Sequence, residues 1–151
     1  MSRIRIVVAD QAEAIFYDAP SLRARPQEVG RISDPVAHLH DRDLMSDRPG
    51  RSYESVGGAR HAIERENDPR SREAIRFAKR IARRLDEARR HDEFEELIVV
   101  AGPPFLGLMR AELSGPTRKR VVHEVHKDLV HSPVEALWQH IPPSAAELRP
   151  A

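Results

Sequence analysis

The sequence predicts a single α/β domain built on a mixed sheet of about five strands with about three helices. Two patterns predict it. The segments 4–9 and 96–102 are short, apolar and rich in β-branched residues, as strands buried on both faces are. The segment 71–91 instead repeats its apolar residues every three or four positions, which is typical of an amphipathic helix. The alternation of the two patterns within 151 residues indicates one α/β domain.

The first third of the chain predicts a small antiparallel meander. The strand at 4–9 is followed, after a few polar residues, by a second apolar run at 14–18 that ends before Pro20. A third, weaker candidate covers 29–33, after Pro26. Short connections of this kind join antiparallel neighbours.

A long polar loop is expected next, over residues 34–70. Prolines and glycines interrupt any regular element there: Pro35, Pro49, Gly50, Gly57 and Gly58. A loop of this length inside a small domain is uncommon, and such loops are usually functional or disordered. The part from 41 to 61 is therefore the first place to look for function.

The helix after the loop has a clear start and two distinct faces. Asp68 is placed to cap it, and Pro69 suits its first position. The apolar stripe consists of Ala74, Phe77, Ala78, Ile81, Ala82, Leu85 and Ala88. The other face carries Arg72, Arg76, Lys79, Arg80, Arg83, Arg84, Arg89 and Arg90.

The remaining sequence predicts strand, helix, strand and helix. The strand at 96–102 leads through a Gly-Pro-Pro break into a helix at 104–113, and a further strand covers 120–126. Ser132 is expected to cap a last helix at 134–141, with Pro133 in its first turn. This order adds parallel strands behind the antiparallel front. The domain is expected to span 1–143, with residues 144–151 as a frayed tail.

Composition limits the classes of function. Lys and Arg total 25 against 24 for Asp and Glu, so global charge does not indicate a polyanionic partner. The absence of cysteine excludes disulfides and thiolate chemistry. The apolar run near the N-terminus is too short for a signal peptide, and no run approaches the roughly 20 apolar residues of a membrane span. We expect a cytoplasmic protein with no membrane insertion and no cofactor.

Local charge is more informative, because cations cluster where the loop meets the helix. A nucleic-acid backbone would be contacted there by Arg48, Arg51, Arg60, His61, Arg72 and Arg76, with Gly57 and Gly58 allowing close approach of the main chain. The predicted basic strip continues along the helix to Arg80, Arg83 and Arg84. Two alternatives compete with this interpretation. Paired glycines commonly serve a turn, and interspersed acidic residues are typical of a solvated helix face.

Carboxylates and imidazoles also cluster in the loop: His38, His40, Asp41, Asp43 and Asp47. None of the usual zinc spacings is present, so ion pairs with the loop arginines are favoured and no metal site is predicted. A small hydrolase using Asp41, Asp43 and His61 is kept as an alternative. A second set, His126, Asp128 and His131, has a structural or surface role as its default.

Segments 41–51, 57–61, 76–78 and 122–129 resemble the bacterial host attachment protein family, and the resemblance covers nearly the whole chain. That family is named for a proposed requirement in attachment to host cells. It is also grouped with bacterial relatives of the class I translation termination factors of archaea and eukaryotes. The middle domain of those factors has a Gly-Gly-Gln loop that leads into a basic helix with an Arg-Phe pair, then a strand and a glycine.

Here the same order is Gly57-Gly58, Arg76-Phe77, the strand at 96–102 and its closing Gly102. Residue 59 is Ala where the termination motif has the glutamine that serves ester hydrolysis. The resemblance therefore implies a shared fold and a non-enzymatic domain that meets RNA or the ribosome through its loop and basic helix. The family name implies an alternative, a protein-interaction factor that contributes to attachment.

Overall fold

The computed structural model describes residues 3–37, 39 and 68–150. A five-stranded sheet runs through it in the order β3-β2-β1-β4-β5. Its strands are β1 (Ile4–Ala9), β2 (Glu13–Ala19), β3 (Gln27–Ser33), β4 (Glu96–Ala101) and β5 (Val121–Val125). The pairs β1–β2 and β2–β3 are antiparallel, whereas β1–β4 and β4–β5 are parallel. The predicted α/β class, the antiparallel front and the parallel additions are confirmed.

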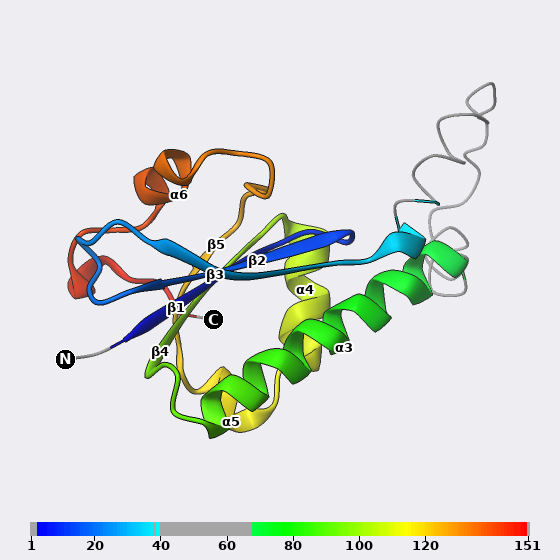
Figure 1. Ribbon diagram of the computed structural model, residues 1–151, viewed down its shortest axis with the longest axis horizontal. Helices are drawn as coiled ribbons and strands as arrows, with labels where there is room; N and C mark the ends of the chain where they lie inside the picture. Colours follow the sequence, from blue (N-terminus) through cyan, green and yellow to red (C-terminus); the bar gives the residue numbers. More distant parts are fainter. Residues whose placement is uncertain (1–2, 38, 40–67, 151) are drawn as a thin grey trace.

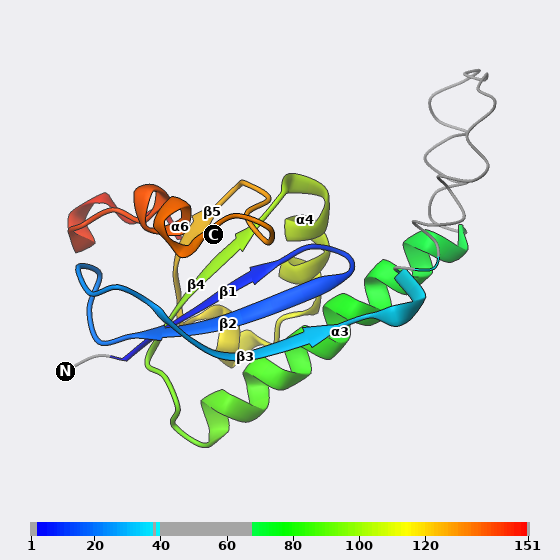
Figure 2. The same cartoon turned by 45° about the horizontal axis from the view of Figure 1, so that its top comes forward.

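Besides a short helical stretch at residues 35–37 and 39, the described residues form four α-helices and one short 3-10 helix. They are α3 (Pro69–Arg90), α4 (Pro103–Glu112), α5 (Gly115–Arg118), α6 (Val134–His140) and η1 (Ala145–Glu147). Figures 1 and 2 show α3 and α4 on one face of the sheet and α6 on the other. The sequence predicted about three helices. It missed α5 because a four-residue helix shows no periodicity.

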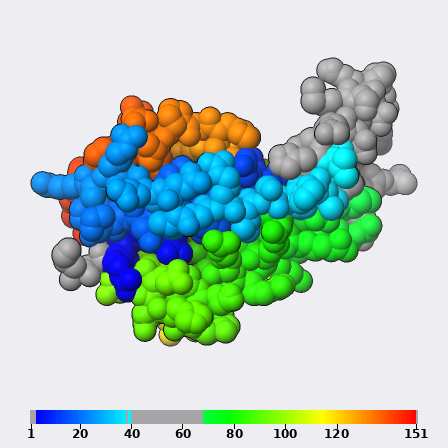
Figure 3. Space-filling view, viewed as in Figure 1, coloured from blue at the N-terminus to red at the C-terminus, as the bar shows by residue number. Residues whose placement is uncertain are grey.

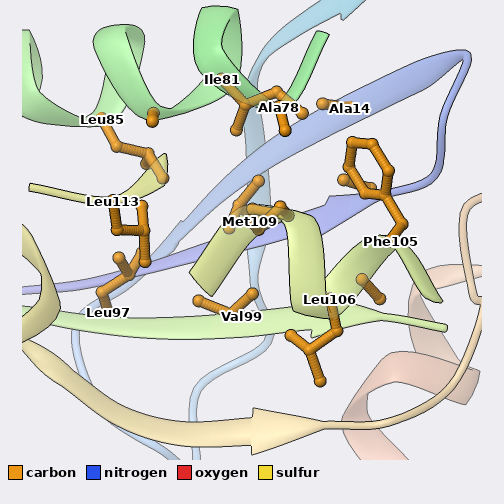
Figure 4. Close-up of a cluster of buried hydrophobic side chains, with 14 of the residues drawn as sticks. Ala14, Ala78, Ile81, Leu85, Leu97, Val99, Phe105, Leu106, Met109 and Leu113 are labelled. Carbon is orange, nitrogen blue, oxygen red and sulfur yellow. The ribbon is translucent and has the colours of Figure 1, made fainter. Parts of the chain in front are cut away.

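The sheet separates two apolar cores, as expected when both faces of its central strands are covered. On one side, α3 and α4 pack on alternate residues of β1 and β4, and Figure 4 shows Ile81 and Met109 facing Leu97 and Val99. On the other side, Leu137 of α6 packs against the remaining strand residues. Both β1 and the last five residues of β4 are buried throughout, as their continuous apolar runs predict.

Helix α3 begins where the sequence predicted. Asp68 is its N-cap, and its side chain accepts a hydrogen bond from the Arg70 backbone N–H at 3.4 Å. Two other expectations need correction. Residues 35–37 and 39 are helical, although 34–70 was expected to be a loop throughout. The N-cap of α6 is Pro133, not Ser132, although the helix starts at Val134 as predicted.

The segment after α6 was expected to fray. In the structure it lies along the edge of β5, where the Glu124 N–H donates to the Arg149 carbonyl at 2.9 Å and the Arg149 N–H donates to His123 Nδ1 at 2.7 Å. These bonds occupy backbone and ring groups at that edge of the sheet. At the opposite edge, β2 is the only described strand beside β3.

Asp86 joins the end of α3 to α5. Its carboxylate accepts hydrogen bonds from Arg89 at 2.8 Å, Arg90 at 2.5 Å, the Ser114 hydroxyl at 2.7 Å and the Thr117 hydroxyl at 3.1 Å. These donors, Arg89 and Ser114 foremost, hold the pKa of Asp86 well below its ordinary range. The carboxylate is therefore favoured in its ionised form by the folded protein.

Replacing Asp86 with Ala should lower the free energy of unfolding by about 2 kcal/mol at pH 7, because buried donors lose a charged acceptor. A lowered pKa stabilises the fold above the ordinary value of 3.8 and stops doing so as the pH falls through the native-state value. The loss in the free energy of unfolding caused by Asp86→Ala should therefore become smaller only at acidic pH. Urea unfolding measures it, with Glu87→Ala, an exposed neighbour, as the control. Equal stability of the two variants would contradict this role.

Candidate functional site: the exposed face of α3 and an adjoining cleft

The predicted site residues fall into two groups. Arg48, Arg51, Gly57, Gly58, Arg60 and His61 lie outside the described residues. Two further sets also lie outside the described residues: the carboxylate and imidazole cluster of His38, His40, Asp41, Asp43 and Asp47, and the hydrolase set of Asp41, Asp43 and His61. These interpretations stay predictions. Arg72 and Arg76 are described, and both are exposed on α3.

The structure divides the cations of α3 into those that pack against the protein and those that face solvent. Arg80 donates a hydrogen bond to the Ser33 carbonyl of β3 at 2.9 Å. Arg84 lies over the Phe16 ring at 5.0 Å and against Gly30 of β3. Figure 3 shows this part of α3 running alongside β3. These two arginines, like Arg89 and Arg90 at Asp86, are therefore engaged within the fold.

Four exposed cations of α3 form a continuous line, which we call the basic stripe: Arg72, Arg76, Lys79 and Arg83. Steps of four, three and four residues place them on one side of a helix, and all four are exposed. Arg76 pairs with Glu73 at 3.2 Å but keeps 74% of its side chain exposed. The stripe is about 16 Å long at 1.5 Å per residue. Of these four, only Lys79 was not among the predicted contact residues.

Glu73 lies beneath the stripe, next to Asp34 at the end of β3. A hydrogen bond to Asp34, together with burial and the charge of Asp34, raises the pKa of Glu73, while Arg76 opposes the rise. Asp34 is 4% exposed, and among the described residues its buried Oδ2 has no N–H or hydroxyl donor. Two carboxylates can share a hydrogen bond only when one is protonated. Protonation of Glu73 thus supplies a donor for Asp34, which is why the pKa of Glu73 is raised.

The N-terminal end of α3 borders a cleft of about 520 Å³. The cleft lies where the parallel strands β1, β4 and β5 end, the edge at which open α/β sheets bind ligands. Its apolar lining comes from Ala12, Ala74, Ile75, Pro104, Phe105 and Leu108. Its polar lining comes from Asp10, Gln11, Arg70, Ser71 and Asp128. A β-carbon added at Gly102 would meet the Asp128 Cβ at 3.7 Å, so the ends of β4 and β5 meet there.

The sequence prediction missed this cleft, although one signal for it was present. Asp10 follows β1 directly and Gly102 follows β4, and the carboxyl ends of parallel strands share an edge. Of the set His126, Asp128 and His131, only Asp128 lines the cleft. His131 Nε2 lies 3.9 Å from Asp10 Oδ2, whereas His126 faces Glu124 at 3.5 Å.

The described part of the chain contains no group of three or more His, Asp or Glu side chains placed to hold a metal ion. Within the same residues, no helix combines the length and the apolar character that crossing a bilayer requires.

Comparison with known proteins gives a family and one relative. The model of the family described as "Protein required for attachment to host cells" matches residues 5–141. The chain is also 25% identical over 134 residues to an uncharacterized protein of Rickettsia prowazekii (strain Madrid E), a match that covers 87% of each chain.

Replacing Glu73 with Gln should stabilise the protein at pH 7, since a neutral amide can donate to Asp34 without a proton. A raised pKa stabilises the fold below the ordinary value of 4.5, and this contribution is lost as the pH rises through the native-state value. The stability that Glu73→Gln adds relative to the unchanged protein should thus increase from pH 4 to pH 7. Thermal unfolding across this range measures it, with Glu112→Gln as the control. A gain that does not vary with pH would refute the shared proton.

Proposed function

The chain belongs to the family of proteins required for attachment to host cells, and on this premise we propose that it is a non-enzymatic binding protein whose basic stripe contacts the phosphate backbone of RNA. The observation that carries the proposal is the alignment of four exposed cations on one side of α3. Phosphate contacts of this kind position a nucleic acid without reading its sequence.

Three features of the stripe support this role. Lys79 and Arg83 make no ion pair or hydrogen bond to any other described residue, so their charge is available to a partner. Glu73, which lies within one turn of Arg76, is directed at Asp34 and Arg76. One strand of a duplex presents a phosphate about every 3.4 Å along its axis, so cations spread over about 16 Å would meet several successive phosphates.

The family resemblance is consistent with the proposal. Kinship with the middle domain of the class I termination factors would place the Arg76-Phe77 pair on the helix that follows their functional loop. Because Ala59 stands in place of the termination glutamine, we propose recognition of RNA or the ribosome in the cytoplasm, without hydrolysis. The loop cations Arg48, Arg51 and Arg60 and the His61 imidazole would extend the contact.

A double replacement tests the stripe: Lys79→Gln with Arg83→Gln. Binding of a fluorescently labelled single-stranded RNA should weaken roughly tenfold at low salt, and the slope of log affinity against log salt should fall by about 1.4, or about 0.7 for each lost phosphate contact. Fluorescence anisotropy over a salt series measures both quantities.

The matched control is Arg23→Gln with Lys119→Gln, which removes the same two types of charge from exposed positions outside α3. Its affinity and salt slope should equal those of the unchanged protein. Equal losses in the two double variants would show that only net charge matters, and that result would overturn the stripe as a binding site.

A second candidate is a protein-interaction role in attachment. It is favoured by the family description and by apolar side chains exposed on or after the terminal strand β3: Val29 at 51%, Val36 at 43% and Leu39 at 54%. An exposed edge strand can add a strand from a partner. In a host-cell attachment assay, this candidate predicts a loss with Val29→Lys and none with the α3 double variant. The opposite pattern would reject it.

A further inference from the structure

We propose that the cleft beside the N-terminus of α3 binds one nucleoside unit, with its base on the apolar wall and its ribose hydroxyls on the two carboxylates. The unit could arrive as a free nucleotide or as the terminal residue of an RNA strand. The shape, the lining and the unsatisfied polar groups of the cleft point to this ligand independently of the basic stripe.

The size and lining of the cleft suit a small ligand. Its volume of about 520 Å³ lies within the range of ligand pockets, which are mostly apolar with a few convergent polar groups. Phe105, Leu108 and Ile75 offer an apolar wall to a planar ring. Phe105 is itself held by Phe77 of α3, with ring centroids 6.2 Å apart. The wall is thus continuous with the core and is available for stacking with a base.

The carboxylates select a ligand that carries hydrogen-bond donors. Asp10 Oδ1 accepts the backbone N–H groups of Ala12 and Glu13, each at 2.8 Å, which orients the side chain at the end of β1. Its Oδ2 lies 3.9 Å from the exposed His131 ring, too far for a hydrogen bond. Asp128 is exposed, and its Oδ1 makes only a long 3.5 Å contact with the Val130 N–H. Both carboxylates therefore retain acceptor capacity.

Ribose hydroxyls are suitable donors for these groups. In dinucleotide-binding folds, an acidic residue near the carboxyl end of a strand accepts a hydrogen bond from a ribose hydroxyl in the same way. A neutral sugar also avoids the repulsion that a polyphosphate would meet beside Asp10 and Asp128. The electrostatics of the cleft thus favour a nucleoside or a monophosphate over a triphosphate.

Arg70 provides the anionic subsite. It lines the cleft, and its Nε is shielded from solvent without a hydrogen-bond acceptor among the described residues. A buried N–H donor without an acceptor is uncommon, and a missing ligand is one explanation for it. A single phosphate near this guanidinium would supply an acceptor of opposite charge. The three subsites, for base, ribose and phosphate, together describe one nucleotide.

Calorimetry with adenosine, AMP, 2′,3′-dideoxyadenosine and ATP tests the inference. AMP should bind saturably, adenosine somewhat less tightly, and both the dideoxy analogue and ATP at least fivefold more weakly than AMP. Asp128→Asn should weaken AMP binding about tenfold, which is the loss of one hydrogen bond to a charged group. No saturable heat with AMP, or ATP binding as tightly as AMP, would overturn it.

Two further variants separate binding from folding. Asp10→Asn keeps an oxygen to accept the turn N–H groups while removing the charge, so it should lose AMP affinity with an unchanged melting temperature. Glu112→Gln, at the end of α4 remote from the cleft, should change neither. If Asp10→Asn and Asp128→Asn both bind AMP as the unchanged protein does, the cleft is not a nucleoside site.

The source of the nucleoside is settled by competition. An RNA terminus is the occupant if a short RNA displaces bound AMP and if this displacement is weaker in the variant that combines Lys79→Gln with Arg83→Gln. AMP binding that RNA does not displace would identify a free nucleotide. AMP binding is measured without RNA, so the two proposals are tested independently. The cleft can bind AMP even if the stripe binds no RNA, and the stripe can bind RNA even if the cleft binds no AMP.

Discussion

The packing of α3 against the sheet is the constraint on which the rest of the structure depends. Its buried face is built largely from alanines, at positions 74, 78, 82 and 88, with larger side chains at Phe77, Ile81 and Leu85. Small side chains let a helix approach its neighbour closely, and a well-packed core tolerates little change in volume. Rotation of α3 would expose this face and bury charges, at a cost of several kcal/mol for each unpaired ion. The cations are therefore confined to the remaining sides.

Contacts at several points along α3 reinforce that orientation. Asp68 caps its first turn, and Asp86 joins its last turns to α5. Between them, Arg80 and Arg84 extend to β3 and β2, and their alkyl stems cover apolar surface. The Arg80 guanidinium donates to the Ser33 carbonyl, and the Arg84 guanidinium lies over the Phe16 ring. Since these arginines hold the helix, Arg72, Arg76, Lys79 and Arg83 remain directed outward.

The same helix connects the two proposed binding regions. Arg70, Ser71 and Ala74 line the cleft, while Arg72 and Arg76 begin the basic stripe within the same two turns. A strand of RNA lying along α3 would thus lead towards the cleft. The ends of the parallel strands β1, β4 and β5 form the other walls of the cleft. One sheet edge and one helix terminus therefore determine the geometry of the cleft. This arrangement suits recognition, because the groups are presented by rigid elements.

Sequence alone predicted the elements whose signals are local. The apolar runs of β1 and β4, and the periodicity and cap of α3, identify those elements without tertiary information. The division of the α3 cations could not be predicted, because Arg80 and Arg84 are distinguished only by the strand beside them. The cleft depends on strand order, which the sequence left as a guess. The predicted residues between 40 and 67 lie outside the described structure and stay predictions.

The proposed binding of RNA along the outward side of α3 can be tested by mapping backbone amide chemical shifts on titration with a short single-stranded RNA. Salt-sensitive shift changes are expected at Arg72, Arg76, Lys79 and Arg83, with α6 and the buried β4 unaffected. Changes confined to α6 and β5, or none in α3 at a saturating RNA concentration, would contradict it.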